Sequence, residues 1–332
     1  MKKQHPLLRY QYLLVALAVI AFEVVLLATQ PHLVATGLEY WWMVPIAFAF
    51  SLVANVAGIS SAALFVPFFI LAFPLLSGTY LATVDTVKLG LITESFGLTS
   101  SALAFLAFGL VDLRIAVRSF LSALPFVVVG VAVVAFVPSS ILYLMVAALL
   151  VVSVLLLHFE ETLRRKRDAR EKLHIPESTA HARGDTIIER TGKDGIVYRY
   201  IYTPFGTLKR SIGYAVGGVF QGATGFGIGE VGIISMLLSH IPVRIAIGTS
   251  HLIVALTAIT ATAVHFLFAT ETLHTGTAFP WVLPLLTVPA VFLAGQAAPH
   301  IAAKIPARYL ERFVSALFIA IAGALVTLAL NG

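Results

Sequence analysis

The sequence contains no cysteine and little charge. Only 11% of its 332 residues are Asp, Glu, Lys or Arg, whereas 59% are hydrophobic. The absence of cysteine excludes disulfide bonds, thiolate metal sites and cysteine nucleophiles. No Asn-x-Ser/Thr glycosylation site occurs either. Such a composition lies far outside the pattern of soluble domains.

Long apolar runs recur along almost the whole chain. Each holds about 20 residues, which is the length needed to cross a bilayer as a helix. We therefore expect an all-α polytopic membrane protein in contact with the lipid bilayer. The first run, from Tyr12 to Thr29, is longer than the core of a signal peptide and lacks an Ala-x-Ala-like cleavage site. It is therefore predicted to be a retained anchor helix over residues 11–29.

The position of the basic residues predicts the orientation. The one long polar segment, from His158 to Ser211, holds 12 Lys or Arg and 8 Asp or Glu. With a cytoplasmic N-terminus, the inside segments are 111–118, 159–210, 241–244 and 299–308, and the outside connections are 30–40, 77–81, 138 and 269–277. No outside connection contains Lys or Arg, as the positive-inside rule requires. The basic segments thus indicate orientation, and we expect a multi-pass protein of the plasma membrane with an external C-terminus. Nucleic-acid binding is not needed to explain the net charge of +6.

The predicted helices fall into two halves. They are expected at 41–57, 60–76, 82–110, 115–137 and 139–158, and at 211–226, 230–240, 244–268, 278–298 and 308–330. Five helical pieces in each half give the halves opposite orientations in the membrane. We thus predict two inverted five-helix repeats plus the N-terminal anchor helix. The corresponding domains are an anchor over 1–40, repeats over 41–158 and 211–332, and a cytoplasmic insertion over 159–210.

Each half opens with two short pieces separated by small residues. These breaks read "NVAGISSAALFVP" (Asn55–Pro67) and "QGATGFGIGEVGI" (Gln221–Ile233). Glycine-interrupted segments at matching positions of two inverted halves indicate a transporter site built from broken or re-entrant helices. The exposed N–H groups of the helix N-termini would attract an anion.

These motifs resemble the TauE/SafE sulfite-exporter family, also called the toluene-sulfonate uptake permeases. The second half carries "GFGIGE" (Gly225–Glu230) and "AIGTS" (Ala246–Ser250), and the first half carries "GISSAALFVP" (Gly58–Pro67). His265 falls where the family often has histidine. The resemblance implies export or uptake of sulfite or small organosulfonates driven by the proton-motive force.

The substrate is expected between the two breaks, surrounded by neutral donors and one lysine. The candidate substrate-binding residues are Asn55, Gly58, Ser60, Ser61, Lys88, Gln221, Thr224, Gly225, Gly227, Thr249, Ser250 and His251. Three alternatives stay open at this stage. The glycines can serve helix packing, the hydroxyls of Thr249 and Ser250 can bond to helix carbonyls, and Lys88 can pair with Asp85 one turn earlier.

Three acids are candidates for proton coupling: Glu94, Glu230 and Asp85. Glu94 is the leading one because an ionisable residue inside a membrane helix is a functional hypothesis by default. It follows Lys88 by six residues, so it lies about 120° away on the helix and is not its direct partner. Glu230 can instead cap the following half-helix. No cofactor and no metal site are expected; His251 and His265 lie about 21 Å apart along one helix and cannot share an ion.

The cytoplasmic insertion has two parts. Its start, "HFEETLRRKRDAREKL", mixes charges at helical spacing and should extend the preceding helix. Further on, "TIIERTGKDGIVYRYIY" (Thr186–Tyr202) alternates apolar and polar residues around a turn and predicts a β-hairpin. A lone hairpin is marginally stable, so it should pack on the membrane domain or pair with a second copy in a homodimer.

A secondary transporter of small anions explains these features best. Two alternatives are a sensor or scaffold that signals through the hairpin, and an anion channel. Enzymatic activity is not expected, because the few acids and histidines lie on separate predicted helices.

Overall fold

The computed structural model describes residues 10–134, 136–170, 186–193, 195–272, 279–302 and 307–331. The first half contains α2 (Gln11–Thr29), α3 (Leu33–Gly37), α4 (Met43–Ala57), α5 (Ala62–Pro67), the π-helix η1 (Phe68–Ala72), α6 (Phe73–Ser77), α7 (Thr83–Ala107), α8 (Leu113–Val134) and α9 (Ser139–Arg170). Two strands follow, β1 (Thr186–Thr191) and β2 (Val197–Tyr202). The second half contains α11 (Pro204–Thr224), α12 (Ile228–Leu238), α13 (Val243–Thr272), α14 (Val282–Ala302) and α15 (Ala307–Asn331).

Among the described residues, seven helices are long and apolar enough to cross a membrane. They comprise α2, α7 and α8, the apolar parts of α9 and α13, and most of α14 and α15. Three shorter apolar helical stretches are Met43–Ala57, Ala62–Ser77 and Ile228–Leu238. The predicted all-α polytopic membrane fold is confirmed.

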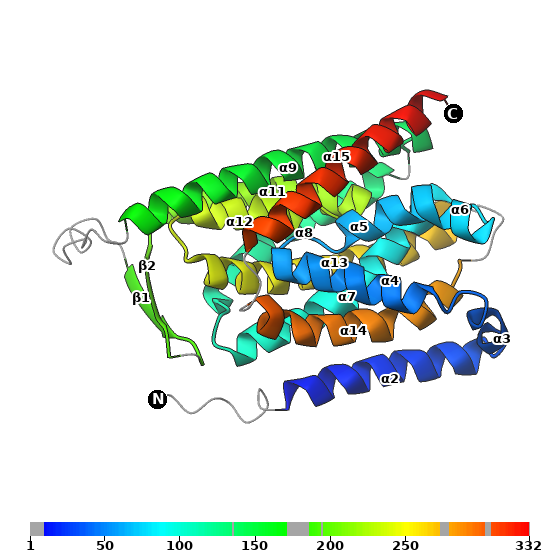
Figure 1. Ribbon diagram of the computed structural model, residues 1–332, viewed down its shortest axis with the longest axis horizontal. Coiled ribbons are helices and arrows are strands. Elements are labelled where there is room, and N and C mark those ends of the chain that lie inside the picture. Colours follow the sequence, from blue (N-terminus) through cyan, green and yellow to red (C-terminus); the bar gives the residue numbers. More distant parts are fainter. Residues whose placement is uncertain are drawn as a thin grey trace.

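The short helices form two helical hairpins that enter the molecule from opposite ends. Helices α4 to α6 enter and return at the end where α3 lies, whereas α11 and α12 do so at the end of the β strands (Figure 1). Their turns require left-handed backbone, with φ of +77° at Gly58, +87° at Gly225 and +112° at Gly227. Glycine adopts this conformation without the steric cost that a Cβ brings. The predicted breaks are therefore present.

Five helical pieces precede the β strands after α3, and five follow them in the described residues, with α5, η1 and α6 taken as one piece. Helix α2 begins at the end of the molecule that carries the β strands, and α15 ends at the opposite end (Figure 1). Helix α4, which opens the first half, and α11, which opens the second half, also start at opposite ends of the molecule (Figure 1). Their symmetry, and which end faces the cytoplasm, stay predictions.

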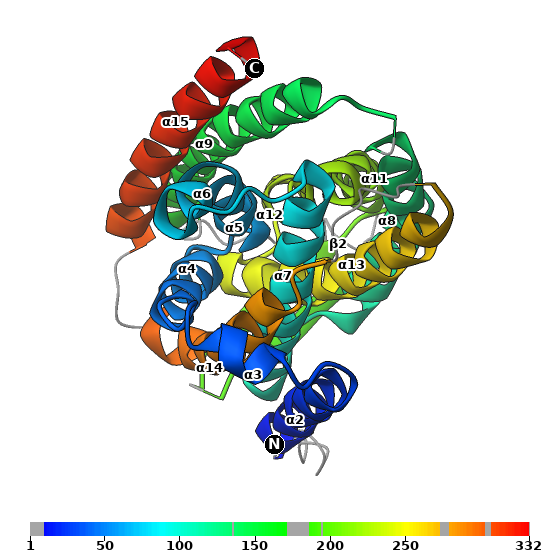
Figure 2. The same ribbon diagram turned by 90° about the vertical axis from the view of Figure 1, so that its right-hand side faces the viewer.

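Helix α7 is the central element of the bundle. Almost all of its side chains are buried, and it packs against α5, α13 and α14. Helix α2 lies at the periphery, where most of its surface is accessible (Figure 2). Its buried end is held by Gln11, which exchanges hydrogen bonds of 2.9 and 3.1 Å with Gln296 of α14. The position of α7 brings its polar residues to the middle of the molecule.

Packing explains some of the glycines that precede the second break. A Cβ on Gly218 would lie 2.9 Å from the backbone oxygen of Ala123, and one on Gly222 would collide with the backbone oxygen of Val127. These two glycines therefore let α11 approach α8 closely, as small residues do in membrane helix pairs. Gly225 and Gly227 serve the turn instead.

Helix α11 begins earlier than the sequence predicted, at Pro204 rather than at residue 211. Thr203 caps it, because its side chain accepts a hydrogen bond of 2.9 Å from Gly206 N, and proline suits the first helical position. The polar residues after Pro204 misled the prediction because they resemble a loop. Helix α9 does continue past its apolar part, to Arg170, as the mixed charges predicted.

The predicted hairpin is present. Strands β1 and β2 pair antiparallel, from Thr186 opposite Tyr202 to Thr191 opposite Val197. Tyr200 and Tyr202 join the core cluster that also contains Ile115 and Ile245 of α8 and α13. The hairpin thus packs on the membrane domain.

Candidate functional site

The tips of the two helical hairpins bring Ser60, Glu94, Gln221 and Glu230 together, and we call these four residues the tip cluster. They come from the first break, α7, the end of α11 and the first turn of α12. All four are buried, with Glu94 and Gln221 fully inaccessible to solvent. Residues distant in the sequence thus form one polar group inside an apolar bundle.

Ser60 bridges the two carboxylates. Its hydroxyl donates to Glu94 Oε1, and its backbone N–H donates to Glu230 Oε1 at 3.1 Å. Gln221 Nε2 donates to the other oxygen of Glu94 at 2.5 Å. The two carboxylates therefore accept hydrogen bonds from Ser60 and Gln221, which the sequence analysis predicted to bind a substrate anion.

The carboxylates also lie at helix N-termini. Glu94 interacts with the backbone N–H of Ala62 at the start of α5, and Glu230 is in the first turn of α12. Both positions favour negative charge because unpaired N–H groups and the helix dipole point there. The tip cluster is thus an anion-binding arrangement whose donors Glu94 and Glu230 occupy.

Several oxygens at the tips have no hydrogen-bond partner among the described residues. They are Asn55 Oδ1, Ser61 Oγ, Gln221 Oε1 and Glu230 Oε2. Glu230 also lines a cavity of about 10 Å³ together with Gly58 and Ser153, enough for one water. Buried polar atoms without partners are uncommon and call for an explanation. Three of these atoms can only accept hydrogen bonds, so a water molecule or a protonated carboxyl group at the tips would supply the missing donor.

Other predicted residues support the turns rather than join the cluster. The Thr224 hydroxyl donates to the backbone oxygens of Phe220 and Phe226 at 2.9 and 3.3 Å. Ser250 Oγ donates to Gly229 O at 3.4 Å. Their hydroxyls thus hold the second break in shape.

The hydrogen bonds of Thr249 and His251 go to residues outside the tip cluster. Thr249 Oγ1 accepts the backbone N–H of Asp112 at 2.9 Å. His251 Nδ1 lies 2.9 Å from Ser101 Oγ of α7. His265, from the same helix as His251, contacts Gly222 O at 2.9 Å, beside Gln221.

Lys88 pairs with Asp85 through a distance of 3.1 Å from Nζ to Oδ1, and both side chains are buried. The ammonium also lies 5.4 Å from the ring centroid of Phe266. This geometry favours the ion-pair interpretation, because the carboxylate and the aromatic face already stabilise the ammonium. The direct contacts of the tip cluster do not include either residue.

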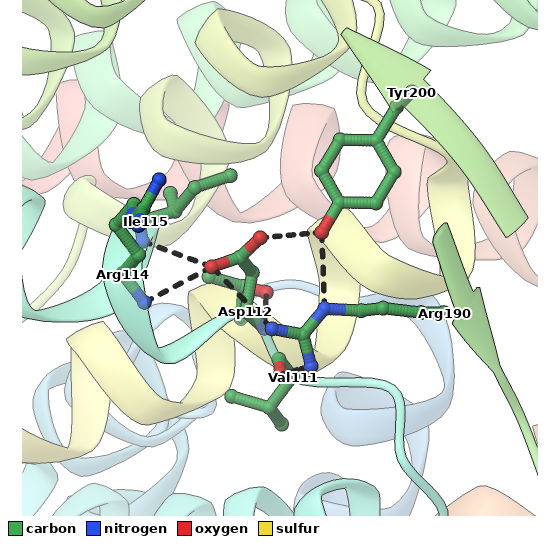
Figure 3. Close-up of polar contacts among 7 residues, drawn as sticks. Val111, Asp112, Arg114, Ile115, Arg190 and Tyr200 are labelled. Atoms are coloured by element: carbon green, nitrogen blue, oxygen red, sulfur yellow. Dashed lines mark hydrogen bonds and ion pairs between the residues drawn. The ribbon is translucent and has the colours of Figure 1, made fainter. Parts of the chain in front are cut away.

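A second polar cluster fixes the β-hairpin of β1 and β2 to the loop between α7 and α8, with Asp112 at its centre (Figure 3). Asp112 Oδ1 accepts the backbone N–H groups of Arg114 and Ile115 at 3.0 and 3.2 Å, so it caps α8. Oδ2 accepts the hydroxyl of Tyr200. Arg190 Nη2 lies 3.6 Å from Oδ1.

The hairpin side chains of this cluster also bind one another. Arg190 Nε donates to the Tyr200 hydroxyl at 3.1 Å, and its Nη1 donates to Val111 O at 2.7 Å. Burial raises the pKa of Tyr200, and the hydrogen bond to Asp112 raises it further. The hydroxyl therefore stays protonated and able to donate. Since Thr249 contacts Asp112, this cluster links the hairpin to α13.

Sequence reasoning did not single out the residues of this second cluster, because they lie in the segments 111–118 and 159–210, outside the predicted membrane helices. One local signal was present: Asp112 directly precedes Leu113, as a helix N-cap does. The partners of Asp112 could not be identified, because nothing local predicts where a hairpin docks.

Comparison with known proteins gives one match. The family model of the sulfite exporter TauE/SafE matches residues 43–325. The matched region starts at the first residue of α4 and ends within α15, so it contains the tip cluster and the β strands and leaves out α2. No curated protein and no solved structure matches the chain.

Proposed function

Because the chain belongs to the TauE/SafE sulfite exporter family of membrane transporters, we propose that it is a secondary transporter of a small sulfur oxyanion, sulfite or an organosulfonate, coupled to protons. One observation carries this proposal. The donors at the hairpin tips form an anion site, and a buried carboxylate of the chain, Glu94, occupies it.

Substrate binding is then an exchange of anions. An incoming oxyanion accepts hydrogen bonds from the Ser60 hydroxyl and the Gln221 amide, which now bind Glu94. A carboxylate that loses these donors while buried next to an anion is stabilised by taking up a proton. The neutral acid can remain in the cluster because Gln221 Oε1 and Glu230 Oε2 have no donor among the described residues.

This exchange couples the binding of the anion to the binding of a proton and sets the direction of the coupling. Anion binding and protonation of Glu94 favour each other, so the anion and the proton cross the membrane in the same direction. Such reciprocity follows from linkage between two binding sites. Mostly neutral donors also suit transport, because binding must be reversible for release on the far side.

Flux measurements in proteoliposomes test the proposal. We expect saturable movement of sulfite and of methanesulfonate that accelerates when the compartment of origin is more acidic. A channel would give flux that rises linearly with anion concentration. Movement that ignores the pH gradient would contradict proton coupling.

Replacing Gln221 by alanine should weaken anion binding. The change removes one neutral donor, which contributes about 1 kcal/mol, or about five-fold in affinity. Calorimetric titration of methanesulfonate into the purified protein measures the effect. Thr260→Ala is the matched control, because its hydroxyl bonds to Leu256 O of its own helix. Equal affinity in the Gln221 variant and the wild type would place the site elsewhere.

A further inference from the structure

Arg210 lies buried near the start of α11, and none of the described carboxylates forms an ion pair with it. Its side chain is only 2% exposed. Nη2 donates to Thr207 Oγ1 at 3.0 Å, but Nη1 has no hydrogen-bond partner in the described part of the chain. A buried guanidinium with a free donor is costly. The position therefore points to a ligand that accepts hydrogen bonds.

Tyr202, the last residue of β2, covers Arg210. The Arg210 Cζ atom lies 5.0 Å from the centroid of the Tyr202 ring. The Tyr202 hydroxyl is also buried and interacts with the Arg210 guanidinium, but it forms no hydrogen bond of normal geometry with any described residue. Two contacting side chains thus each offer a donor, one charged and one neutral, as a small oxyanion requires.

The charge around this pair is mostly positive. Arg114 Cζ lies 5.9 Å from the Tyr202 ring centroid. Asp112 acts on both Tyr202 and Arg210, but it already contacts Arg190. Besides Arg210, the arginines that contact or act on Tyr202 are Arg114 and Arg118. Such an excess of positive charge attracts anions.

The geometry of α11 connects this region with the tip cluster. Gln221 follows Arg210 by eleven residues, which corresponds to about 16 Å along the axis and about 20° in azimuth. The two side chains therefore project from the same face of one helix. Tyr214 lies between them and packs against Gly232 of α12. Helix α11 begins two residues after β2 ends, at the end of the molecule where the β strands lie (Figure 1), so this face of the helix leads from the β-hairpin to the tip cluster.

We propose that Arg210 and Tyr202 form a second binding site for small oxyanions, at the end of α11 that adjoins the β-hairpin. An anion binds there before it reaches the tip cluster or after it leaves. This role in transport rests on the proposed function, whereas the binding site itself can be tested without transport. Asp112 and Arg190 contribute by fixing the hairpin so that Tyr202 stays over Arg210.

The test counts bound anions. Methanesulfonate is titrated calorimetrically into the purified full-length protein and into Arg210→Met. We expect two anions per chain in the wild type and one in the variant. Gln221→Ala in the Arg210→Met background should then weaken the remaining site. Arg199→Met is the matched control, because Arg199 is an exposed arginine of β2, the strand that carries Tyr202, and it pairs with Glu189.

Tyr202→Phe tests the site with a smaller change. It removes only the hydroxyl, and we expect about a five-fold weaker affinity at one of the two sites. This variant decides the question if Arg210→Met fails to give a cooperative thermal unfolding transition. One anion per chain in the wild type, or two unchanged sites in the variants, would overturn the proposal while leaving the tip cluster as the transport site. A wild type that binds no anion would contradict the proposed function as well.

Discussion

Replacing Glu94 by glutamine is expected to abolish transport driven by a pH gradient while anion exchange continues. Ser60 and Gln221 donate to separate oxygens of Glu94; glutamine keeps one of these oxygens as an acceptor, but it cannot bind and release a proton. Proteoliposomes containing the variant should accumulate no methanesulfonate above protein-free liposomes under a pH gradient. Exchange of external for internal methanesulfonate without a gradient should remain.

The matched control is Glu23→Gln. It makes the same chemical change in a membrane helix, but Glu23 is on the peripheral helix α2 and only partly buried. This control should respond to the pH gradient as the wild type does. Full pH-driven accumulation in Glu94→Gln would assign proton coupling to another group, with Glu230 the next to test because it shares Ser60.

Replacing Gly222 by leucine is expected to prevent folding. A Cβ at this position collides with the backbone oxygen of Val127 and lies 2.8 Å from the backbone nitrogen of Val131. No side-chain rotamer relieves the collision, because the Cβ position is fixed by the backbone. Overpacking inside a core typically costs about 1–3 kcal/mol, and separation of α8 from α11 would also expose the tip cluster. Fluorescence-detected size exclusion should show aggregated protein.

Gly323→Leu is the control for this substitution. Gly323 is in α15, and a Cβ there meets no atom within 4 Å. We expect a monodisperse peak and an unchanged unfolding temperature. A well-folded Gly222→Leu protein would show that the close approach of α8 and α11 is not needed for the fold.

Much of the fold follows from patterns that are local in sequence. Apolar length predicts the spans, and the glycine breaks at Gly58 and Gly225 predict the two turns, because a positive φ leaves a local signature. The alternation between Thr186 and Tyr202 predicts the hairpin for the same reason. The start of α11 was missed because Pro204 and the polar residues after it resemble a loop and a helix N-terminus equally.

The site was predictable only in part. The breaks indicated Ser60 and Gln221, and the polarity of α7 indicated Glu94, but no local pattern shows that Glu94 accepts the hydrogen bonds of the other two residues. That contact joins residues up to 127 positions apart and depends on how three helices pack. Thr249 was predicted to bind the substrate because it belongs to the "AIGTS" segment; in the structure its hydroxyl accepts the backbone N–H of Asp112, in a loop that no local pattern connects with α13.

Proton uptake on anion binding tests the central claim most directly. Methanesulfonate, which does not titrate near neutral pH, is added to weakly buffered purified protein with a pH indicator, and the bound anion is counted in parallel by calorimetry. Competition between the anion and the Glu94 carboxylate predicts an uptake of up to one proton per anion bound at the tip cluster, approached at a pH where Glu94 is ionised before the anion is added. The same titration of Glu94→Gln should show binding without uptake. Anion binding to the wild type with no change in pH would contradict the account.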